Sequence, residues 1–266
     1  MHGKEAVLVP PLVRTLALLP IVPSGFDTDA FGTFTGDVAR VGTALEAARR
    51  KARAAMALCG VHTAVASEGS FGPHPGLPLL PLAAELVLLL DDELGLEVIA
   101  EDVGTDTNFA GQQVLDARDA LTFAARVQFP SHRLVVLAEG APAATVRGIA
   151  DADQLRQEVE RMLREHACVR VQTDMRADRN PTRMRAIARA AERLAERAAK
   201  RCPHCHWPGH GLVGVERGLP CADCGEASEL VRAERHGCAR CGRSEERPRR
   251  DGRTQCDPGE CQFCNP

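Results

Sequence analysis

Cys202-Pro203-His204-Cys205 opens the stretch that decides how the end of this chain folds. Three more Cys-x-x-Cys pairs follow, with fifteen residues between the first and second pairs and 19 between the third and fourth. Each such turn places two thiolates on one side of a tight loop, which supplies two corners of a tetrahedral zinc site. The pattern therefore predicts a zinc-ribbon module over residues 201–266 with one or two structural zinc ions. The predicted ligands are Cys202, Cys205, Cys221, Cys224, Cys238, Cys241, Cys261 and Cys264.

The four pairs can combine in two ways. Neighbouring pairs would form two four-cysteine sites in series, whereas joining the first pair with the third and the second with the fourth would interleave them. Cys256 is a spare thiol for the last site, and three histidines lie close enough to compete: His204, His206 and His236. Four thiolates leave no open coordination position, so the pattern favours structural over catalytic zinc. Zinc binding can contribute roughly 10–16 kcal/mol to the folding of a small module.

The composition bounds the rest of the chain. Its 266 residues, 44% of them apolar, are enough for a large front domain over residues 1–200 besides the tail. A net charge of -3 gives the whole chain no bulk attraction to nucleic acid or to acidic lipid. The start of the sequence has no signal-peptide pattern, and the apolar stretch 77–90 is too short to span a bilayer. We therefore expect a cytoplasmic protein without membrane segments, whose clustered cysteines bind metal.

The front part predicts an α/β domain, a mixed sheet flanked by helices. Helices are expected at 43–58, where Thr43 and Glu46 form a capping-box pattern, and at 117–128, 151–166 and from Asn180-Pro181 to about 200. Strands are expected at 63–66, 86–90, 96–100, 134–138 and 169–172. Two apolar runs within 5–22 predict strands, or a strand and a short helix. Glycine and proline predict loops at 25–42 and 67–75.

Two acidic residues and a lysine form the first candidate site of the front part. Glu46 and Glu68 could hold Mg²⁺, and Lys51 could offset phosphate charge. The segments Thr43–Ala52 and Ala66–Ser70 resemble motifs of the inosine/xanthosine triphosphate pyrophosphatases. The resemblance implies a nucleoside triphosphate pyrophosphatase-like fold, in which the glutamates manage metal and attacking water and the lysine meets phosphate. The alternative for Glu46 is a capping role at its helix start.

Two further segments extend this resemblance. His2-Gly3-Lys4 resembles a phosphate-binding motif of the same family, which implies that Lys4 binds phosphate. Ser131-His132-Arg133 resembles its late Ser-His-Arg motif, which implies that His132 contacts the base.

A second resemblance covers nearly the whole chain. The sequence is similar to an uncharacterised bacterial family that is known only as a domain of unknown function and carries a zinc-ribbon tail. This similarity implies no activity. The segments that carry it are His2–Glu5, Phe31–Gly36, Ala66–Pro75, Thr105–Phe109, Phe129–His132, Thr173–Arg176, Asn180–Met184 and the terminal Cys-x-x-Cys-Asn-Pro.

Polar residues before the last front helix form a second candidate site. Asp174, Arg176, Asn180 and Arg183 cluster just before a helix N-terminus, where anions bind, and arginine suits phosphate contacts. Residues 170–201 hold ten basic and four acidic residues, which are typical of a solvated helix face or of RNA binding. The tail's ten arginines are matched by ten acidic residues, which weakens the case for nucleic acid.

Two isolated residues complete the candidates. Asn108 lies in a polar loop that either binds ligand or simply turns, and His74 between two prolines is a general base, a ligand or a structural residue. Together these patterns predict Mg²⁺-dependent cleavage of a nucleotide or related phosphate compound. The alternative is a non-catalytic sensor of a phosphorylated ligand, or a binding protein for nucleic acid or a protein partner.

Overall fold

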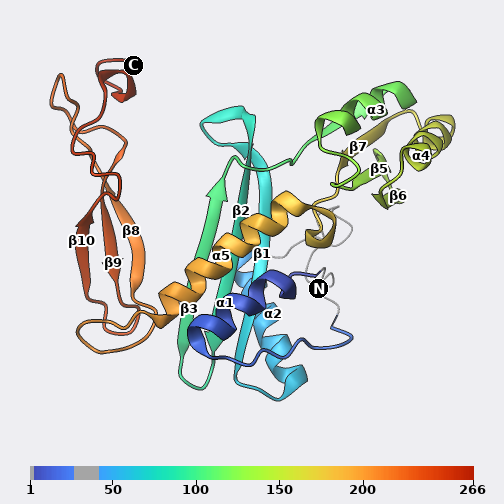
Figure 1. The fold of residues 1–266 in the computed structure, drawn as a ribbon. Coiled ribbons are helices and arrows are strands. Elements are labelled where there is room, and N and C mark those ends of the chain that lie inside the picture. The colour runs from blue at the N-terminus through green and yellow to red at the C-terminus, as the bar shows by residue number, and fades with distance from the viewer. Residues whose placement is uncertain (1–2, 27–41) are drawn as a thin grey trace. The chain divides into compact units, whose positions relative to one another are not determined.

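The computed structural model describes residues 3–26 and 42–266, and these form an α/β protein with five α-helices and three sheets (Figure 1). The α/β class expected from the sequence is confirmed, and the strand pairs within every sheet are antiparallel. Contacts divide the chain into two compact units, Met1–Ala195 and Glu196–Pro266. The segment Phe31–Gly36 and most of the expected loop at 25–42 lie outside the described residues.

The first sheet has the order β1-β2-β3 and consists of β1 (Thr63–His74), β2 (Leu77–Asp91) and β3 (Leu96–Gly104). Helix α2 (Ala44–Cys59) packs on one face of it. Successive strand residues point to opposite faces, so every second leucine at the end of β2 meets the alanine-rich face of α2. The core formed there contains Ala48, Ala52, Met56, Ala66, Leu86, Leu88 and Leu90.

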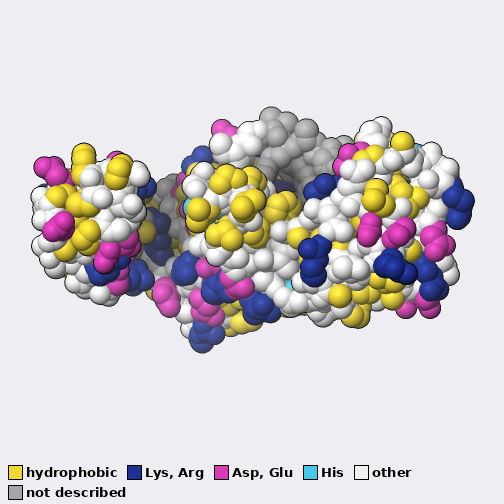
Figure 2. Space-filling view, turned by 90° about the horizontal axis from the view of Figure 1, so that it is seen from above, with side chains coloured by type: hydrophobic (Ala, Val, Ile, Leu, Met, Phe, Trp, Pro, Cys, Tyr) yellow, Lys and Arg dark blue, Asp and Glu magenta, His cyan; other side chains and the backbone are white. Residues whose placement is uncertain are grey.

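The loop predicted at 67–75 is wrong, because β1 continues through this segment. Ser67 pairs with Val87 and Phe71 with Ala83, in a ladder that runs on to Pro73. The long apolar strand β2 supplies hydrogen-bond partners for a glycine- and proline-rich segment that has little strand propensity of its own. At the tip of this hairpin, apolar side chains gather at the surface, as Figure 2 shows, and Leu79 is 98% exposed.

The strand predicted for the first apolar run is also wrong. Residues Glu5–Leu16 form helix α1, although it contains Pro10 and Pro11. Ala17 ends the helix in the left-handed conformation, and its N–H bonds back to Val13. Exposed Arg14 pairs with Glu192 of helix α5.

The second sheet has the order β4-β7-β5-β6 and two covering helices. Its core is aliphatic and includes Leu134, Val136, Val171, Leu155 and Met162, all fully buried. The helix and strand positions match the sequence predictions, apart from β4 and β6, which the sequence analysis did not assign as strands. The elements are β4 (Gly111–Val114), α3 (Ala117–Arg126), β5 (Leu134–Ala138), β6 (Ala141–Ile149), α4 (Ala152–Glu165) and β7 (Val169–Thr173).

Helix α5 (Pro181–Ala199) follows a short 3-10 turn, Ala177–Arg179. Asn180 caps it, because the Arg183 N–H donates to Asn180 Oδ1 at 2.9 Å. The helix contacts the first sheet through Arg189, whose guanidinium pairs with Asp102 of β3 at 2.7 Å. Arg193 pairs with the same carboxylate at 2.9 Å. Arg189 also lies 3.5 Å from Asp106, so two carboxylates pair with these two arginines of the basic face, which weakens the case for RNA binding there.

The second unit contains a sheet of order β10-β9-β8, built from β8 (Gly211–Arg217), β9 (Val231–Gly237) and β10 (Ser244–Pro248). These strands separate the four cysteine pairs along the chain. Among the residues that the structure describes, no helix combines the length and apolarity needed to cross a bilayer.

Candidate functional site

The cysteine pairs of the tail interleave. Cys202 and Cys205 join Cys238 and Cys241, and the second and fourth pairs form the other group; in each group the sulfur atoms lie within 4.8 Å of one another. The antiparallel ladder explains this choice. Gly211 at the start of β8 pairs with Gly237 at the end of β9, so the pair before β8 and the pair after β9 meet at one end of the sheet.

Both groups fit a tetrahedral metal ion. A tetrahedron with metal–sulfur bonds of about 2.3 Å has sulfur–sulfur edges of about 3.8 Å. The measured edges are 3.6 Å between Cys205 and Cys238 Sγ and 3.8 Å between Cys202 and Cys241 Sγ. Two edges of the other group are also 3.8 Å. These distances exclude disulfides, whose sulfurs lie about 2.05 Å apart. Each group can therefore hold a metal ion, and the donor sets are compatible with structural zinc.

The spare residues of the tail have other partners. Cys256 is buried against Leu219 and Cys261, in a small apolar cluster beside the second group. His236 Nε2 lies 2.8 Å from Glu234 Oε2, and His204 Nδ1 lies 3.1 Å from Arg243. Neither Cys256 nor a histidine belongs to the metal groups found among the described residues. The four Cys-x-x-Cys pairs thus form both sites.

Backbone N–H groups stabilise the thiolates. The N–H of Cys205, followed by that of His204, lowers the pKa of the Cys202 thiol to about 7. The Cys224 N–H does the same for Cys221, whose pKa also falls to about 7. A lower thiol pKa favours the deprotonated form that binds metal.

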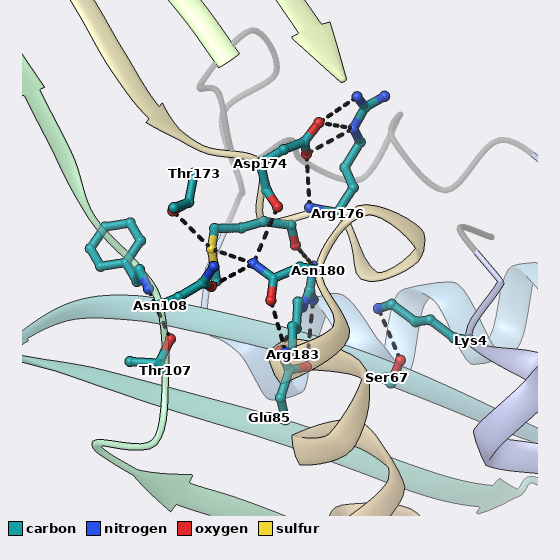
Figure 3. Close-up of polar contacts among 12 residues, drawn as sticks. Lys4, Ser67, Glu85, Thr107, Asn108, Thr173, Asp174, Arg176, Asn180 and Arg183 are labelled. Atoms are coloured by element: carbon teal, nitrogen blue, oxygen red, sulfur yellow. Dashed lines mark hydrogen bonds and ion pairs between the residues drawn. The ribbon is translucent and has the colours of Figure 1, made fainter. Parts of the chain in front are cut away.

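The first unit contains a cavity of about 420 Å³ between α1, residues 18–26, α2 and β1. Most of its lining is apolar, but Lys4, Lys51 and Ser67 line it as well. We call this cavity the lysine pocket. The Lys4 ammonium donates to Ser67 Oγ at 3.0 Å (Figure 3). Lys51 forms an ion pair with Glu68, and both side chains are largely buried.

Lys4 differs from an ordinary lysine in its electrostatic surroundings. Burial, followed by the nearby Arg183 cation, lowers its pKa to about 7. Glu85 and Glu68 act in the opposite direction, and Lys51 adds a smaller lowering effect. The uncharged amine of Lys4 is therefore accessible near neutral pH.

A network of polar residues connects the two sheets of the first unit (Figure 3). Its centre is an ion pair between Arg183 Nε and Glu85 Oε1 at 2.6 Å, in which both side chains are at most 1% exposed. Asn180 donates to Asn108 Oδ1 at 2.8 Å, and Asp174 binds Arg176 at 2.6 Å. The charges in this network largely cancel, so its geometry indicates a structural role.

Comparison with known families decides the classification. The family described as Domain of unknown function (DUF6671) matches residues 51–266, which are most of the chain. The chain belongs to the DUF6671 family. The matched region includes Lys51, Glu68 and all four cysteine pairs, whereas Lys4 precedes it. Neither a curated protein nor a solved structure matches the chain, so the pyrophosphatase resemblance has no support from these comparisons.

The fold of this DUF6671 chain brings together three of the residues singled out in its sequence. Lys4, Lys51 and Glu68 lie in or next to the lysine pocket. Glu46 instead completes the capping box, where its Oε2 accepts the Thr43 N–H at 2.7 Å. The capping interpretation is confirmed, and the structure gives Glu46 no contact with the other three.

Two of the remaining predicted ligand residues, His132 and His74, have hydrogen bonds that support the fold. His132 is buried, and its Nε2 accepts the Thr182 N–H at the start of α5, at 3.2 Å. His74 Nδ1 accepts the N–H groups of Gly76 and Leu77 and so shapes the β1–β2 turn. Ligand-binding roles for Asn108, Asp174, Arg176, Asn180 and Arg183 stay predictions, since each has protein partners in the network above.

Sequence reasoning missed Ser67 and Glu85 as site residues. Ser67 lies within the segment Ala66–Ser70, in which only Glu68 was a candidate. Glu85 had a visible signal, a single acidic residue inside the apolar stretch 77–90. A charge in such a strand requires a buried partner, but which arginine supplies it depends on the tertiary structure.

Proposed function

We propose that the first unit binds a small amphipathic anion in the lysine pocket. The observation that carries this proposal is the pocket's composition, an apolar cavity of about 420 Å³ with two lysines and a serine among its lining residues. This volume is typical of sites for small organic ligands. The apolar part of the ligand would lie against α1 and β1, and its phosphate or carboxylate would meet Lys4, Lys51 and Ser67.

Lys4 is the cation of the pocket that would meet an anion, and the lining also includes the carboxylate residue Glu5. Glu68 neutralises Lys51, and Glu85 neutralises Arg183. The Lys4 ammonium has a neutral partner, Ser67, among the residues that the structure describes. An arriving anion stabilises the protonated form of Lys4 and raises its pKa. Binding near pH 7.5 should therefore take up a proton.

Calorimetric titration tests this proposal with three ligands of equal chain length: octanoate, octyl phosphate and octylamine. We expect an anion to bind with proton uptake, seen as a difference in apparent enthalpy between HEPES and Tris buffers, and octylamine not to bind. The two anions distinguish a carboxylate from a phosphate ligand. Lack of binding by both anions, or equal binding of the amine, would reject the proposal.

Variants locate the binding site. Lys51→Met combined with Glu68→Gln removes an ion pair as a whole, so that no buried carboxylate is left unpaired. This variant should weaken anion binding at least about tenfold, which corresponds to about 1.4 kcal/mol. Lys200→Met is the matched control, because Lys200 is exposed and belongs to the second unit. An equal loss of anion affinity in both variants would contradict the proposed location.

A second candidate is the Mg²⁺-dependent hydrolase expected from the sequence, supported by the proximity of Lys51 and Glu68. Among the described residues, however, the groups with three or more potential metal ligands are the two cysteine clusters. Hydrolysis of nucleoside triphosphates with Mg²⁺, measured for the wild type and for Glu68→Gln, tests this candidate. Turnover by the wild type that is lost in a folded variant would support it. Metal-independent binding without product formation would favour the sensor instead.

For the tail we infer two structural zinc ions, because closed four-thiolate sites leave no position for substrate. Metal analysis of the purified protein should find two zinc ions per chain. A zinc content near zero in a folded tail would contradict this inference.

A further inference from the structure

The use of lysine in this chain is unusual. Of 33 basic residues, thirty are arginine and three are lysine: Lys4, Lys51 and Lys200. Two of the three line one cavity. Elsewhere in the first unit, buried or partly buried cations that pair with carboxylates are arginines, such as Arg183 with Glu85 and Arg49 with Glu97. An amine can lose its proton and act as a nucleophile, which a guanidinium cannot do.

The two lysines of the pocket have different environments. Lys51 forms an ion pair with the carboxylate of Glu68. Lys4 has a hydroxyl partner, Ser67 Oγ at 3.0 Å, and lies near the Arg183 cation in a mostly apolar cavity. Desolvation and a neighbouring cation are the two conditions that activate an amine nucleophile.

We propose that Lys4 forms an imine with a 2-oxo acid whose apolar chain occupies the lysine pocket and whose carboxylate meets Lys51. This proposal rests on the anion binding proposed above and names the class of its ligand. It gives Lys51, Lys4 and Ser67 distinct tasks, while Glu5, His62 and Thr63 also line the pocket and take no part in the reaction. Lys51 binds the carboxylate, and Lys4 attacks the carbonyl carbon. The Ser67 hydroxyl transfers the proton that the amine loses.

The chemistry balances without an oxidant or a reductant. The Lys4 lone pair forms the carbon–nitrogen bond, and the carbonyl π electrons move to oxygen, which accepts a proton and gives a carbinolamine. In forming the carbinolamine the nitrogen gives up one of its two protons to the oxygen; it gives up the second as the protonated hydroxyl group leaves as water, and a carbon–nitrogen double bond remains. The hydroxyl of Ser67, in hydrogen-bond contact with Lys4 Nζ, can pass protons between nitrogen and oxygen.

Reductive trapping tests the proposal. The full-length protein is incubated at pH 7 with 2-oxooctanoate and sodium cyanoborohydride, which converts an imine into a stable secondary amine, and the modified lysines are located by mass spectrometry. The exposed Lys200 is an internal control within the same chain. We expect Lys4 to be modified at least about tenfold faster than Lys200. An amine with a pKa near 7 is half deprotonated there, compared with about four in ten thousand for an ordinary lysine of pKa about 10.4.

The outcomes separate this proposal from the binding proposal. Octanoate binding without a Lys4 adduct would overturn the imine chemistry and leave anion binding standing. Failure of both would reject both, and an adduct confined to Lys4 without octanoate affinity would support only the imine. In a Lys4→Arg variant the adduct should disappear while Lys200 modification persists. A Lys4 rate equal to that of Lys200 in the folded protein would also overturn the proposal.

Discussion

Replacing Glu85 by glutamine tests whether the buried ion pair holds the first unit together. The amide keeps the shape of the side chain but removes its charge, and Arg183 then loses the carboxylate that it pairs with in the interior. Both side chains are at most 1% exposed, and Nε and Oε1 lie 2.6 Å apart. Removal of one partner of such a pair costs about 3–5 kcal/mol.

The surroundings of the pair support this magnitude. Arg183 also donates to the Met175 carbonyl and lies over the Phe71 ring at 5.2 Å, but neither group carries a negative charge. A Cβ at Gly69 would lie 2.6 Å from Glu85 Oε1 and 2.7 Å from Arg183 Nη2, so the pair fits closely against the β1 backbone. Little space is left for water to replace the lost carboxylate beside the guanidinium.

The assay is thermal unfolding followed by far-UV circular dichroism in the presence of zinc. For a unit of this size, each kcal/mol shifts the midpoint by about 2–4 °C, so Glu85→Gln should lower it by about 6–20 °C. Trp207 is the only tryptophan and lies in the second unit, so its fluorescence follows the tail separately.

Two controls complete the test. Glu93→Gln changes an exposed side chain at the β2–β3 turn and should alter stability by no more than about 0.5 kcal/mol. Glu85→Leu with Arg183→Met replaces the pair by apolar groups and should recover most of the loss. A shift below about 2 °C for Glu85→Gln, or a double variant as unstable as the single one, would refute the reasoning.

Three further predictions concern other parts of the chain. Because the folded-state pKa of Lys4, about 7, lies below the ordinary lysine value of 10.5, the unfolded state binds the extra proton and stability should rise from pH 7 towards 10. Lys4→Met should therefore be more stable than the wild type in urea unfolding at pH 7, and the difference in their free energies of unfolding should decrease as the pH rises. A difference that does not change with pH would argue against burial of a charged Lys4. Cys202→Ser with Cys238→Ser should retain one zinc ion by metal analysis, because both belong to one site, whereas pairing in series would lose both ions. Asn180→Ala should cost about 1–2 kcal/mol in urea unfolding through loss of the α5 cap, and a cost near zero would exclude that role.

Local signals predicted the helices well. Thr43 and Glu46 formed the expected capping box, and Asn180 caps α5 as the Asn-Pro pattern indicated. The apolar seam of α4 is buried at Leu155. These features depend on residues three or four positions apart, which is the range over which sequence patterns are informative. The first apolar run and the 67–75 segment were misassigned, since their conformations depend on partners distant in the chain.

The sequence by itself determined that the tail contains four metal-binding turns, because each Cys-x-x-Cys unit is complete within four residues. Which turns share an ion was decided by the tertiary structure, since antiparallel pairing of β8 with β9 joins the first turn to the third. The same holds for the lysine pocket. Lys4 and Ser67 are 63 residues apart in sequence, and only the packing of α1 beside α2 and β1 places them in one cavity and removes the water that would otherwise keep Lys4 charged.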